Sequence, residues 1–443
     1  MTSFKRDRSV VVIELGGGND ALNTVIPYNN GLYYDSRPVI GIPQSDVLKI
    51  DGELGLNPNL APIKHLWDQG KLAIINGIGY PNPNRSHFRS RDIWYTAEPE
   101  KIGGAGWLGA TIRDLDPTGE NVLTGVNFGR GLPLAMVCKD VPVASVGNLE
   151  TYGLFPDIKD EMMRKYALDA FSQMYGPVEG KDAIAQVLSQ TGADVLKGAD
   201  TLRTAPAKYS SSIEYGESRI AYGLKNLAQV MFADLGTRIF YTSYSNFDTH
   251  SIQLLAHAKL WQSVSAAISN FTDDLNEHGM ADDTLILVFS EFGRRVRDNG
   301  SGCDHGFAGV TFVLGGAVQG GFYGEHPSLR EEDQVEGDLR FNNDFRSTYA
   351  TILDRWLASN PCHPGTTRFG EWVGIEAGQG VECPEFRTPV WADADAGSLG
   401  HPVNLDQFGQ SATPADIRLK YLEQFLVDQF LECTGGVLVL STS

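Results

Sequence analysis

Acidic and histidine side chains follow three apolar segments of this 443-residue chain, at the point where each segment ends. Asp20 follows the first segment, Asp248 and His250 follow the second, and Glu291 and His305 follow the third. A mixed set of carboxylates and imidazoles can bind a divalent cation, and a larger share of imidazole favours Zn²⁺ or Mn²⁺ over Ca²⁺ or Mg²⁺. Taken singly, each residue is more often an ion-pair or capping residue. Their joint placement at one predicted edge of the sheet favours a divalent-metal site there, with these residues among its candidate ligands.

A second group of candidate residues lies in the segment NPNRSHFRSR, where two preceding prolines disfavour a helix until about Ser86. A helix that begins there places Ser86 beside unpaired backbone amides, which attract an anion. Ser86 suits a nucleophile that attacks phosphorus or sulfur, and it suits a helix N-cap equally well. His87, Arg89 and Arg91 are nearby residues that could hold the anion.

Arginine side chains follow the third apolar segment directly. Arg294 or Arg295 could bind a tetrahedral oxyanion through two parallel hydrogen bonds, for which guanidinium geometry is suited. A metal ion would neutralise substrate charge and lower the pKa of a hydroxyl or water nucleophile. We therefore predict Ser86, His87 and Arg294 as catalytic residues.

The elements that must position these residues alternate between strand and helix. Ser9–Leu15 is predicted to be a buried strand, followed by a glycine turn. Residues 237–244 form a second strand, and a helix with apolar residues in steps of three and four starts near Ile252. It leads to the apolar run at residues 283–290. This order predicts a right-handed βαβ unit whose polar loops share one edge of the sheet.

The chain is predicted to form one large α/β domain over residues 1–443, with two additions. Residues 117–209 are less regular and predict a cap or insertion over the carboxyl edge of the sheet. Residues 360–443 predict a loop-rich C-terminal appendage that a helix near residues 415–431 closes.

Composition limits the class of partner. The net charge of −19 disfavours nucleic acid, whose phosphates such a surface repels. No apolar stretch approaches the roughly 20 residues that cross a bilayer, so no transmembrane segment is expected. The five cysteines contain no CxxC pair, which argues against a zinc ribbon. The first residues lack a secretory leader, so the protein is expected to be cytoplasmic, or exported to the periplasm if a leader was removed. The oligomeric state stays open.

Several segments resemble the domain-of-unknown-function family 1501, which belongs to the alkaline phosphatase and sulfatase superfamily. The resemblance covers nearly the whole chain and implies a central, mostly parallel sheet flanked by helices. It also implies a metal-dependent hydrolase of phosphate or sulfate esters, acting on an anionic small molecule or glycan ester and often exported through the twin-arginine route. The segments are, in order, VVIELGGGNDALNT, LAIINGIGYPNPNRSHFRSRDIWY, GAGWLGA, FDTH, LILVFSEFGRR, DHG and NDFRSTYATILDRWL.

The superfamily pattern carries over unevenly onto this chain. His305 matches the histidine of the late metal-binding loop, and Ser86 falls where a nucleophilic serine or threonine would lie. Asp248 and His250 resemble the superfamily's usual Asp-x-x-x-His pair, but only one residue separates them here. The aspartate after the first strand is replaced by glycines, which leaves Asp20 as a substitute.

The usual Asp-His or Asp-Asn pair appears as Glu291-Phe292, which removes one ligand. The resemblance therefore implies one metal site rather than two. Its ligands would be Asp248, His250, Glu291 and His305, with Asp20 nearby. Because no Cys-x-Pro-x-Arg motif occurs, it favours a serine-based or metal-water mechanism over that of ordinary sulfatases. Two alternatives stay open. One is a non-catalytic binding or surface protein that recognises an anionic glycan or a protein partner, and the other is a phosphomutase-like transferase.

Overall fold

The computed structural model describes residues 7–149, 152, 158, 160–174, 183–359 and 438–439, and it places strand β1 (Ser9–Leu15) in the middle of a large sheet. All seven residues of β1 are buried, and its run of valine and isoleucine is typical of a parallel strand covered on both faces. Strands β8 (Ile239–Tyr244) and β9 (Thr284–Phe289) pair with β1 in parallel, one on each side. Helix α9 (Gln253–Glu277) connects them. The predicted parallel strand–helix–strand unit is confirmed, and the loops after β1, β8 and β9 open at one edge.

The described part of this sheet has 10 strands, in the order β11-β5-β10-β9-β1-β8-β6-β7-β13, with β12 beside β5. Most neighbouring strands are parallel, whereas β10 runs antiparallel to β5 and β9, and β13 runs antiparallel to β7. The mostly parallel sheet is as predicted. Its further strands are β5 (Leu72–Gly79), β6 (Gly125–Phe128), β7 (Val143–Val146), β10 (Gly309–Leu314), β11 (Gly321–Tyr323), β12 (Asn343–Asp344) and β13 (Leu438–Val439). Strands β2 (Val25–Ile26), β4 (Gly55–Leu56) and β3 (Leu48–Lys49) form a smaller sheet.

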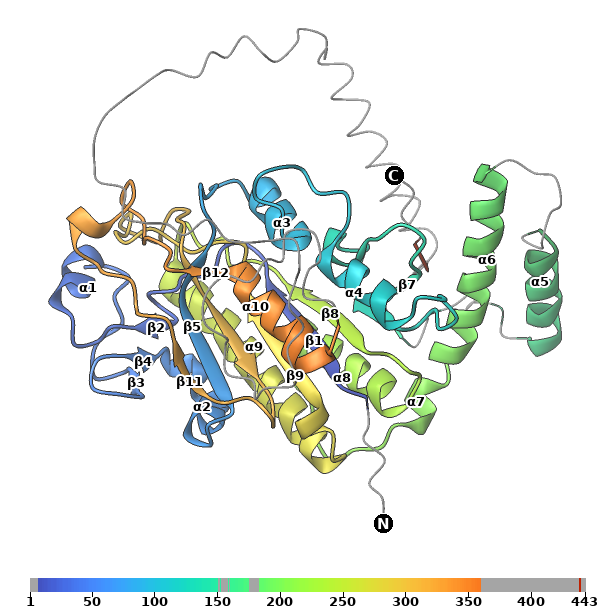
Figure 1. Ribbon diagram of the computed structural model, residues 1–443. Coiled ribbons are helices and arrows are strands. Elements are labelled where there is room, and N and C mark those ends of the chain that lie inside the picture. The colour runs from blue at the N-terminus through green and yellow to red at the C-terminus, as the bar shows by residue number, and fades with distance from the viewer. Residues whose placement is uncertain are drawn as a thin grey trace, which may run out of the picture.

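Helices cover both faces of the large sheet (Figure 1), and successive residues of β1 belong to two different cores. Val11 and Ile13 pack on the side of α2, α8 and α9, whereas Val10 and Val12 pack on the side of α3, α4 and α10. This alternation follows from strand geometry, which points successive side chains to opposite faces. These helices are α2 (Ala61–Asp68), α3 (His87–Thr96), α4 (Trp107–Leu115), α8 (Arg219–Phe232) and α10 (Phe345–Thr351), which a π-helix (Ile352–Leu357) continues.

The interpretation of residues 117–209 as a cap needs correction. Strands β6 and β7 lie within this range and pair in parallel with each other, and β6 pairs with β8, so they extend the main sheet. Strand β6 is too short, at four residues, to give a strong sequence signal. Helices α5 (Glu161–Met174) and α6 (Ala183–Leu202) lie at one side of the molecule (Figure 1). The predicted appendage at residues 360–443 falls outside the described residues, except for β13.

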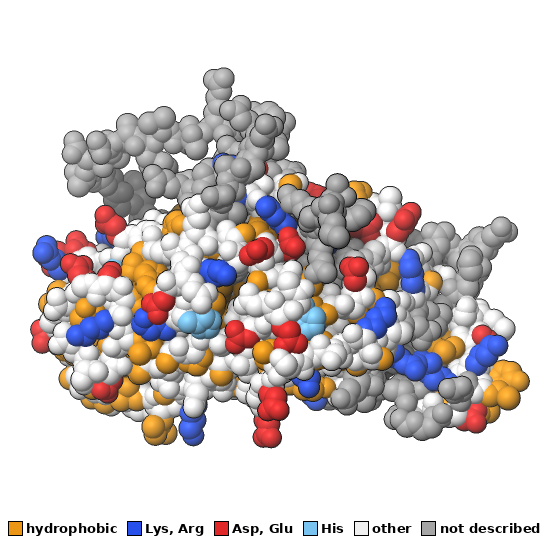
Figure 2. All heavy atoms as spheres, turned by 90° about the horizontal axis from the view of Figure 1, so that it is seen from below, with side chains coloured by type: hydrophobic (Ala, Val, Ile, Leu, Met, Phe, Trp, Pro, Cys, Tyr) orange, Lys and Arg blue, Asp and Glu red, His pale blue; other side chains and the backbone are white. Residues whose placement is uncertain are grey.

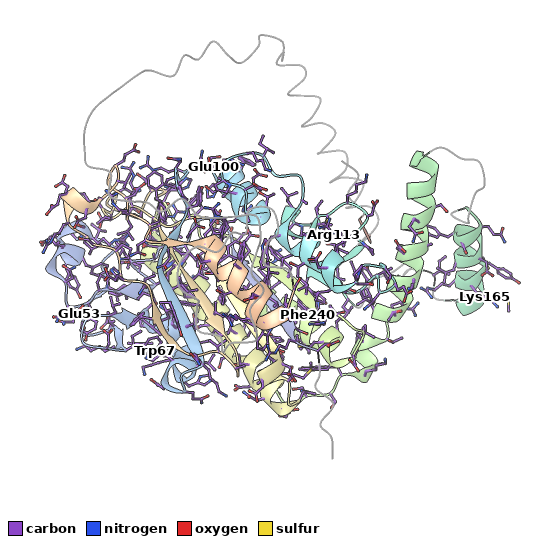
Figure 3. All side chains as sticks on the ribbon, viewed as in Figure 1. Glu53, Trp67, Glu100, Arg113, Lys165 and Phe240 are labelled. Atoms are coloured by element: carbon purple, nitrogen blue, oxygen red, sulfur yellow. The ribbon has the colours of Figure 1, made fainter. Side chains whose placement is uncertain are left out.

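The interior and the surface differ as expected for a layered α/β protein. Phe240 on β8 is fully buried near the centre of Figure 3, whereas Glu53 and Lys165 are exposed at opposite ends of that view. Figure 2, a view from below that of Figure 1, shows a face on which basic, acidic and hydrophobic side chains are interspersed. Within the described ranges, no helix combines the length and apolar character that crossing a bilayer requires.

Candidate functional site

Loops at the carboxyl edge of the sheet bring three histidines and one aspartate together. His87 is the first residue of α3, Asp248 and His250 follow β8, and His305 lies between β9 and β10. The Nε2 atoms of His250 and His305 each lie 3.0 Å from Asp248 Oδ1, and His87 Nε2 lies 3.4 Å from Asp248 Oδ2. Three of the four predicted ligands from these later loops therefore converge, and His87 joins them. We call His87, Asp248, His250 and His305 the histidine cluster.

Each imidazole of the histidine cluster has its other ring nitrogen bonded to an oxygen that can only accept. The Nδ1 atoms must therefore carry the hydrogen, and each neutral ring keeps its lone pair on Nε2, facing Asp248. Metal-binding histidines in proteins are oriented in this way. The acceptors are Glu291 Oε1 for His87 at 2.9 Å, Asp304 Oδ1 for His250 at 3.0 Å and the carbonyl oxygen of Arg85 for His305 at 2.8 Å.

Three residues of the histidine cluster, His87, Asp248 and His305, each place one donor atom within 4.8 Å of the others. Tetrahedral zinc with bonds of about 2.0–2.1 Å places neighbouring donor atoms roughly 3.3 Å apart. Here His250 Nε2 and His305 Nε2 are 3.0 Å apart. Three imidazoles and one carboxylate favour such a metal over Ca²⁺ or Mg²⁺, which prefer oxygen ligands. His87, Asp248 and His305 could thus hold a divalent cation, with His250 beside them.

Glu291 lies behind the cluster and not among the converging atoms. Its carboxylate is buried and accepts hydrogen bonds from the backbone amides of Gly17 and Gly18, at 3.0 and 3.2 Å, as well as from His87. Burial raises the pKa of Glu291, but the hydrogen bond from His87 and the charge of Arg91 outweigh it, so the pKa is lowered. The hydrogen bond to Glu291 in turn raises the pKa of His87. Glu291 therefore orients the His87 ring and does not itself face Asp248.

Asp20, the fifth predicted ligand, is enclosed in the protein. It is fully buried and forms an ion pair of 2.6 Å with Arg37, and it accepts hydrogen bonds from the amides of Leu22 and Asn23. The side chain of Gln253 also donates to it. Burial raises the pKa of Asp20, but the neighbouring Arg37 outweighs it, so the pKa is lowered. Asp20 has the environment of a structural ion pair that fixes the loop after β1.

Arg294 does not fit the predicted role of oxyanion clamp. Its side chain has no exposed surface, and its donors are bonded to the carbonyl oxygens of Gly18 and Cys303 and to the Asp248 carboxylate, at 2.7, 2.8 and 2.6 Å. Burial raises the pKa of Asp248, but the hydrogen bond and the positive charge of Arg294 outweigh burial and hold the pKa well below its usual range. Arg294 therefore keeps Asp248 ionised and joins three loops beneath the histidine cluster.

Ser86 occupies the N-cap position of α3, but its side chain makes no capping hydrogen bond. The residue is exposed and immediately precedes His87. A hydroxyl without a capping partner is free to contact a ligand. Of the two roles that the sequence left open, the geometry gives no support to the N-cap.

Phe292 contacts two imidazoles of the histidine cluster. Its buried ring lies 4.9 Å from the ring of His87 and 4.8 Å from that of His305, measured between centroids. A Cβ at Gly18 would overlap the Phe292 ring, so a glycine is needed there. Phe292 thus packs against two imidazoles of the histidine cluster.

Sequence reasoning assigned His87 to anion binding and did not single out Glu14. The signal for Glu14 was present, because it is the one charged residue in the apolar strand β1. Its buried carboxylate accepts hydrogen bonds from Tyr95 and Tyr241, at 2.8 and 2.6 Å, and lies 3.0 Å from Arg91 Nε. Glu14 and Arg91 therefore add a negative and a positive charge next to the histidine cluster.

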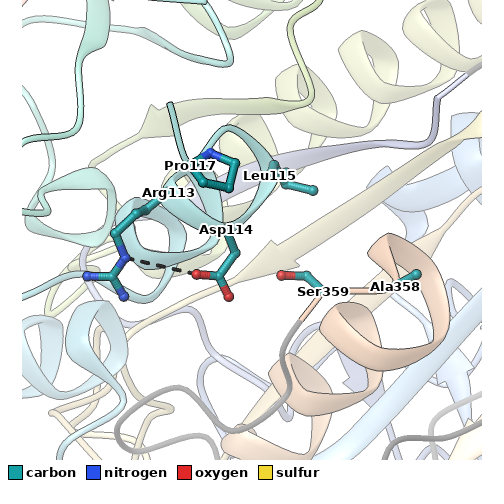
Figure 4. Close-up of a pocket in the computed structure, with 6 residues that line it drawn as sticks. All are labelled: Arg113, Asp114, Leu115, Pro117, Ala358 and Ser359. Atoms are coloured by element: carbon teal, nitrogen blue, oxygen red, sulfur yellow. Dashed lines mark ion pairs between the residues drawn. The ribbon is translucent and has the colours of Figure 1, made fainter. Parts of the chain in front are cut away.

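A separate cavity of about 560 Å³ lies between the end of α4 and the end of the π-helix (Figure 4). It contains no residue of the histidine cluster. Arg113 and Asp114 form an ion pair of 3.9 Å at its wall. The lining residues are Arg113, Asp114, Leu115, Pro117, Ala358 and Ser359.

Three solved structures illustrate what the chain is similar to. The C-terminal periplasmic domain of EcEptC from Escherichia coli, in complex with Zn, is 7% identical, with 84% of this chain and 90% of that chain covered and a TM-score of 0.37. The PsFucS1 sulfatase from Pseudoalteromonas sp. is 11% identical, with 76% and 70% covered and a TM-score of 0.31. A protein in the alkaline phosphatase superfamily from Vibrio parahaemolyticus is 11% identical, with 73% and 64% covered and a TM-score of 0.30.

A comparison with curated proteins finds no match. Residues 76–352 match the family described as "Protein of unknown function (DUF1501)". The matched range covers more than half of the chain and contains the whole histidine cluster. The chain therefore belongs to the DUF1501 family.

Proposed function

We propose that the protein is a metal-dependent hydrolase of phosphate or sulfate esters, with the histidine cluster as its cation site. The observation that supports this most is the convergence of three Nε2 atoms on the Asp248 carboxylate while every Nδ1 is held by an acceptor. This donor set favours Zn²⁺ or Mn²⁺ over Ca²⁺ or Mg²⁺. The substrate is an anionic small molecule or glycan that carries the ester.

The residues around the cluster can perform two related reactions. A divalent cation bound there would neutralise the charge of the ester and lower the pKa of a coordinated hydroxyl or water. In the first route Ser86 Oγ attacks phosphorus or sulfur, the ester oxygen leaves, and water then cleaves the serine ester. In the second route water attacks directly. The exposed hydroxyl of Ser86, one residue before His87, favours the first route.

The test combines metal content with turnover. The protein is stripped with a chelator, reloaded with Zn²⁺ or Mn²⁺, and assayed with 4-nitrophenyl phosphate and 4-nitrophenyl sulfate. We expect Ser86→Ala to keep its metal and lose at least about 100-fold in kcat, since a nucleophile cannot be replaced by positioning alone. His305→Ala should lose both metal and turnover. His65→Ala, on the distant helix α2, should keep both.

Three outcomes decide between the readings. Full turnover by metal-loaded Ser86→Ala would assign the water route. Unchanged metal content and turnover in both Ser86→Ala and His305→Ala would rule out the proposal. A wild-type protein that binds one metal but cleaves neither ester would instead support the binding-protein alternative. That alternative has some structural support, because Asp20 and Glu291 are engaged elsewhere and only one cation site is formed by the cluster.

A further inference from the structure

Three arginines near the histidine cluster differ in whether all of their guanidinium N–H groups have hydrogen-bond acceptors. Arg294 is enclosed, as described above. Arg89 forms an ion pair with Asp92 and donates to three backbone carbonyls beyond α3. Arg91 contacts Glu14 and Glu291 through Nε, and its terminal nitrogens have no hydrogen-bond acceptor among the described residues. Of these three arginines, Arg91 alone combines free terminal donors with partial exposure, at 36% of its side chain.

The Nε side of Arg91 is held in place by buried acids. Arg91 Nε lies 3.0 Å from Glu14 Oε1 and 3.6 Å from Glu291 Oε1. The first contact is an ion pair and not a hydrogen bond, because the N–H does not point along it. Tyr95 and Tyr241 fix the Glu14 carboxylate by donating to it. The guanidinium is therefore anchored on one side, which leaves the edge formed by Nη1 and Nη2 for a ligand.

Arg91 is also next to the histidine cluster. It follows His87 by four residues on α3, so the two side chains share a face of the helix, and both contact Glu291 Oε1. Arg91 Nη2 lies over Gly16, where a Cβ would overlap it, and the Asp248 amide lies over Gly17 in the same way. Gly16 and Gly17 are consecutive residues, and consecutive Cα atoms are about 3.8 Å apart. Arg91 and Asp248 therefore both contact the short loop that follows β1.

We propose that Arg91 binds the substrate anion: its Nη1 and Nη2 donate to two oxygens of a tetrahedral phosphate or sulfate whose other oxygens face the histidine cluster. Glycine at position 16 is required to leave room for the guanidinium. The identity of the ester rests on the hydrolase function proposed above, but binding of the anion is measurable without any turnover.

The experiment titrates inorganic phosphate and inorganic sulfate into the zinc-loaded protein by calorimetry. Arg91→Ala should bind the tighter of the two anions on the order of tenfold to a hundredfold more weakly, because it loses a charge-assisted pair of hydrogen bonds. Arg91→Lys should recover only part of the loss, since a lysine lacks the fork geometry. Arg113→Ala, on helix α4 at the separate cavity, is the control and should keep wild-type affinity. Zinc content and Tm are recorded for every variant.

A second variant tests the geometry without removing a charge. Gly16→Ala places a methyl group where Arg91 Nη2 lies, so it should also weaken anion binding, whereas Gly52→Ala, which has open space around it, should not. The proposal is overturned if Arg91→Ala binds both anions within twofold of wild type, if the zinc-loaded wild type binds neither, or if Arg91→Ala loses its zinc together with the anion.

The outcomes separate this proposal from that of hydrolysis. Arg91-dependent anion binding by a protein that cleaves neither ester would support Arg91 and contradict the hydrolase. Turnover with unchanged KM and unchanged inhibition by phosphate in Arg91→Ala would contradict the role of Arg91 and leave the hydrolase in place.

Discussion

His250 Nε2 lies 3.0 Å from His305 Nε2, and both atoms lie 3.0 Å from the same carboxylate oxygen of Asp248. With the Nδ1 hydrogens committed to Asp304 and to a backbone carbonyl, two neutral rings would point their lone pairs at each other. Burial lowers the pKa of His305, which favours its neutral form. A cation between the rings removes this repulsion, so metal binding should stabilise the fold.

Zinc should raise the stability of the wild-type protein and not that of His250→Ala. Zinc at a free concentration of 100 times its dissociation constant should add about 2.7 kcal/mol to the free energy of unfolding, because the ligands are assembled only in the folded state. The measurement is the Tm with and without zinc, and with excess chelator. Equal zinc-induced shifts in the two proteins would show that the metal binds elsewhere.

Glu291→Gln should weaken zinc binding without abolishing it. As the acceptor for His87 Nδ1, Glu291 orients a ligand, and such outer contacts change metal affinity by roughly 10–100-fold. Competition with a chromophoric chelator measures the dissociation constant. Were Glu291 itself a ligand, as its sequence position suggested, the variant would resemble His305→Ala and show no stoichiometric zinc even at saturation.

Gly18→Ala should destabilise both the loop after β1 and the metal site. Gly18 has a φ of +80°, in which an alanine costs roughly 1–2 kcal/mol, and the new Cβ would overlap the Phe292 ring that packs against His87 and His305. We expect a lower free energy of urea unfolding and weaker zinc binding. Gly52→Ala serves as the control, and equal stability of the two variants would contradict the close packing described here.

Stability should fall on acidification partly because of His257. This buried ring contacts Asn19 Oδ1 at 2.9 Å, and burial lowers its pKa to about 4. An unfolded histidine has a pKa of roughly 6.5, so the unfolded state binds more protons between these values and stability rises with pH across this window. The contribution is complete above the unfolded pKa and amounts to on the order of 3 kcal/mol.

Urea unfolding at pH 7 and pH 5, with chelator present, measures this contribution. His257→Gln can keep the hydrogen bond to Asn19 and should show a smaller loss between the two pH values than wild type. His65→Gln should behave like wild type. A pH dependence that is the same in His257→Gln and wild type would refute the assignment.

The sequence determined which elements form and which loops meet. The apolar run of β1, the apolar periodicity of α9 and the apolar strand β9 are local properties of the chain, and parallel pairing then places their following loops at one edge of the sheet. Asp248, His250 and His305 were therefore predictable as neighbours. The short strand β6 was not, because its four residues carry little periodic signal and depend on β8 for pairing.

Only the tertiary structure decided the role of each charged residue. Asp20 and Asp248 both follow strands, yet Asp20 is neutralised by Arg37 inside the protein while Asp248 faces three imidazoles. Similarly, Arg294 donates its hydrogen bonds to carbonyl oxygens of distant loops, whereas the terminal nitrogens of Arg91 have no acceptor among the described residues. Whether a side chain is a ligand, a support or an anion contact depends on which partners long-range folding supplies, and residue type and spacing do not contain that information.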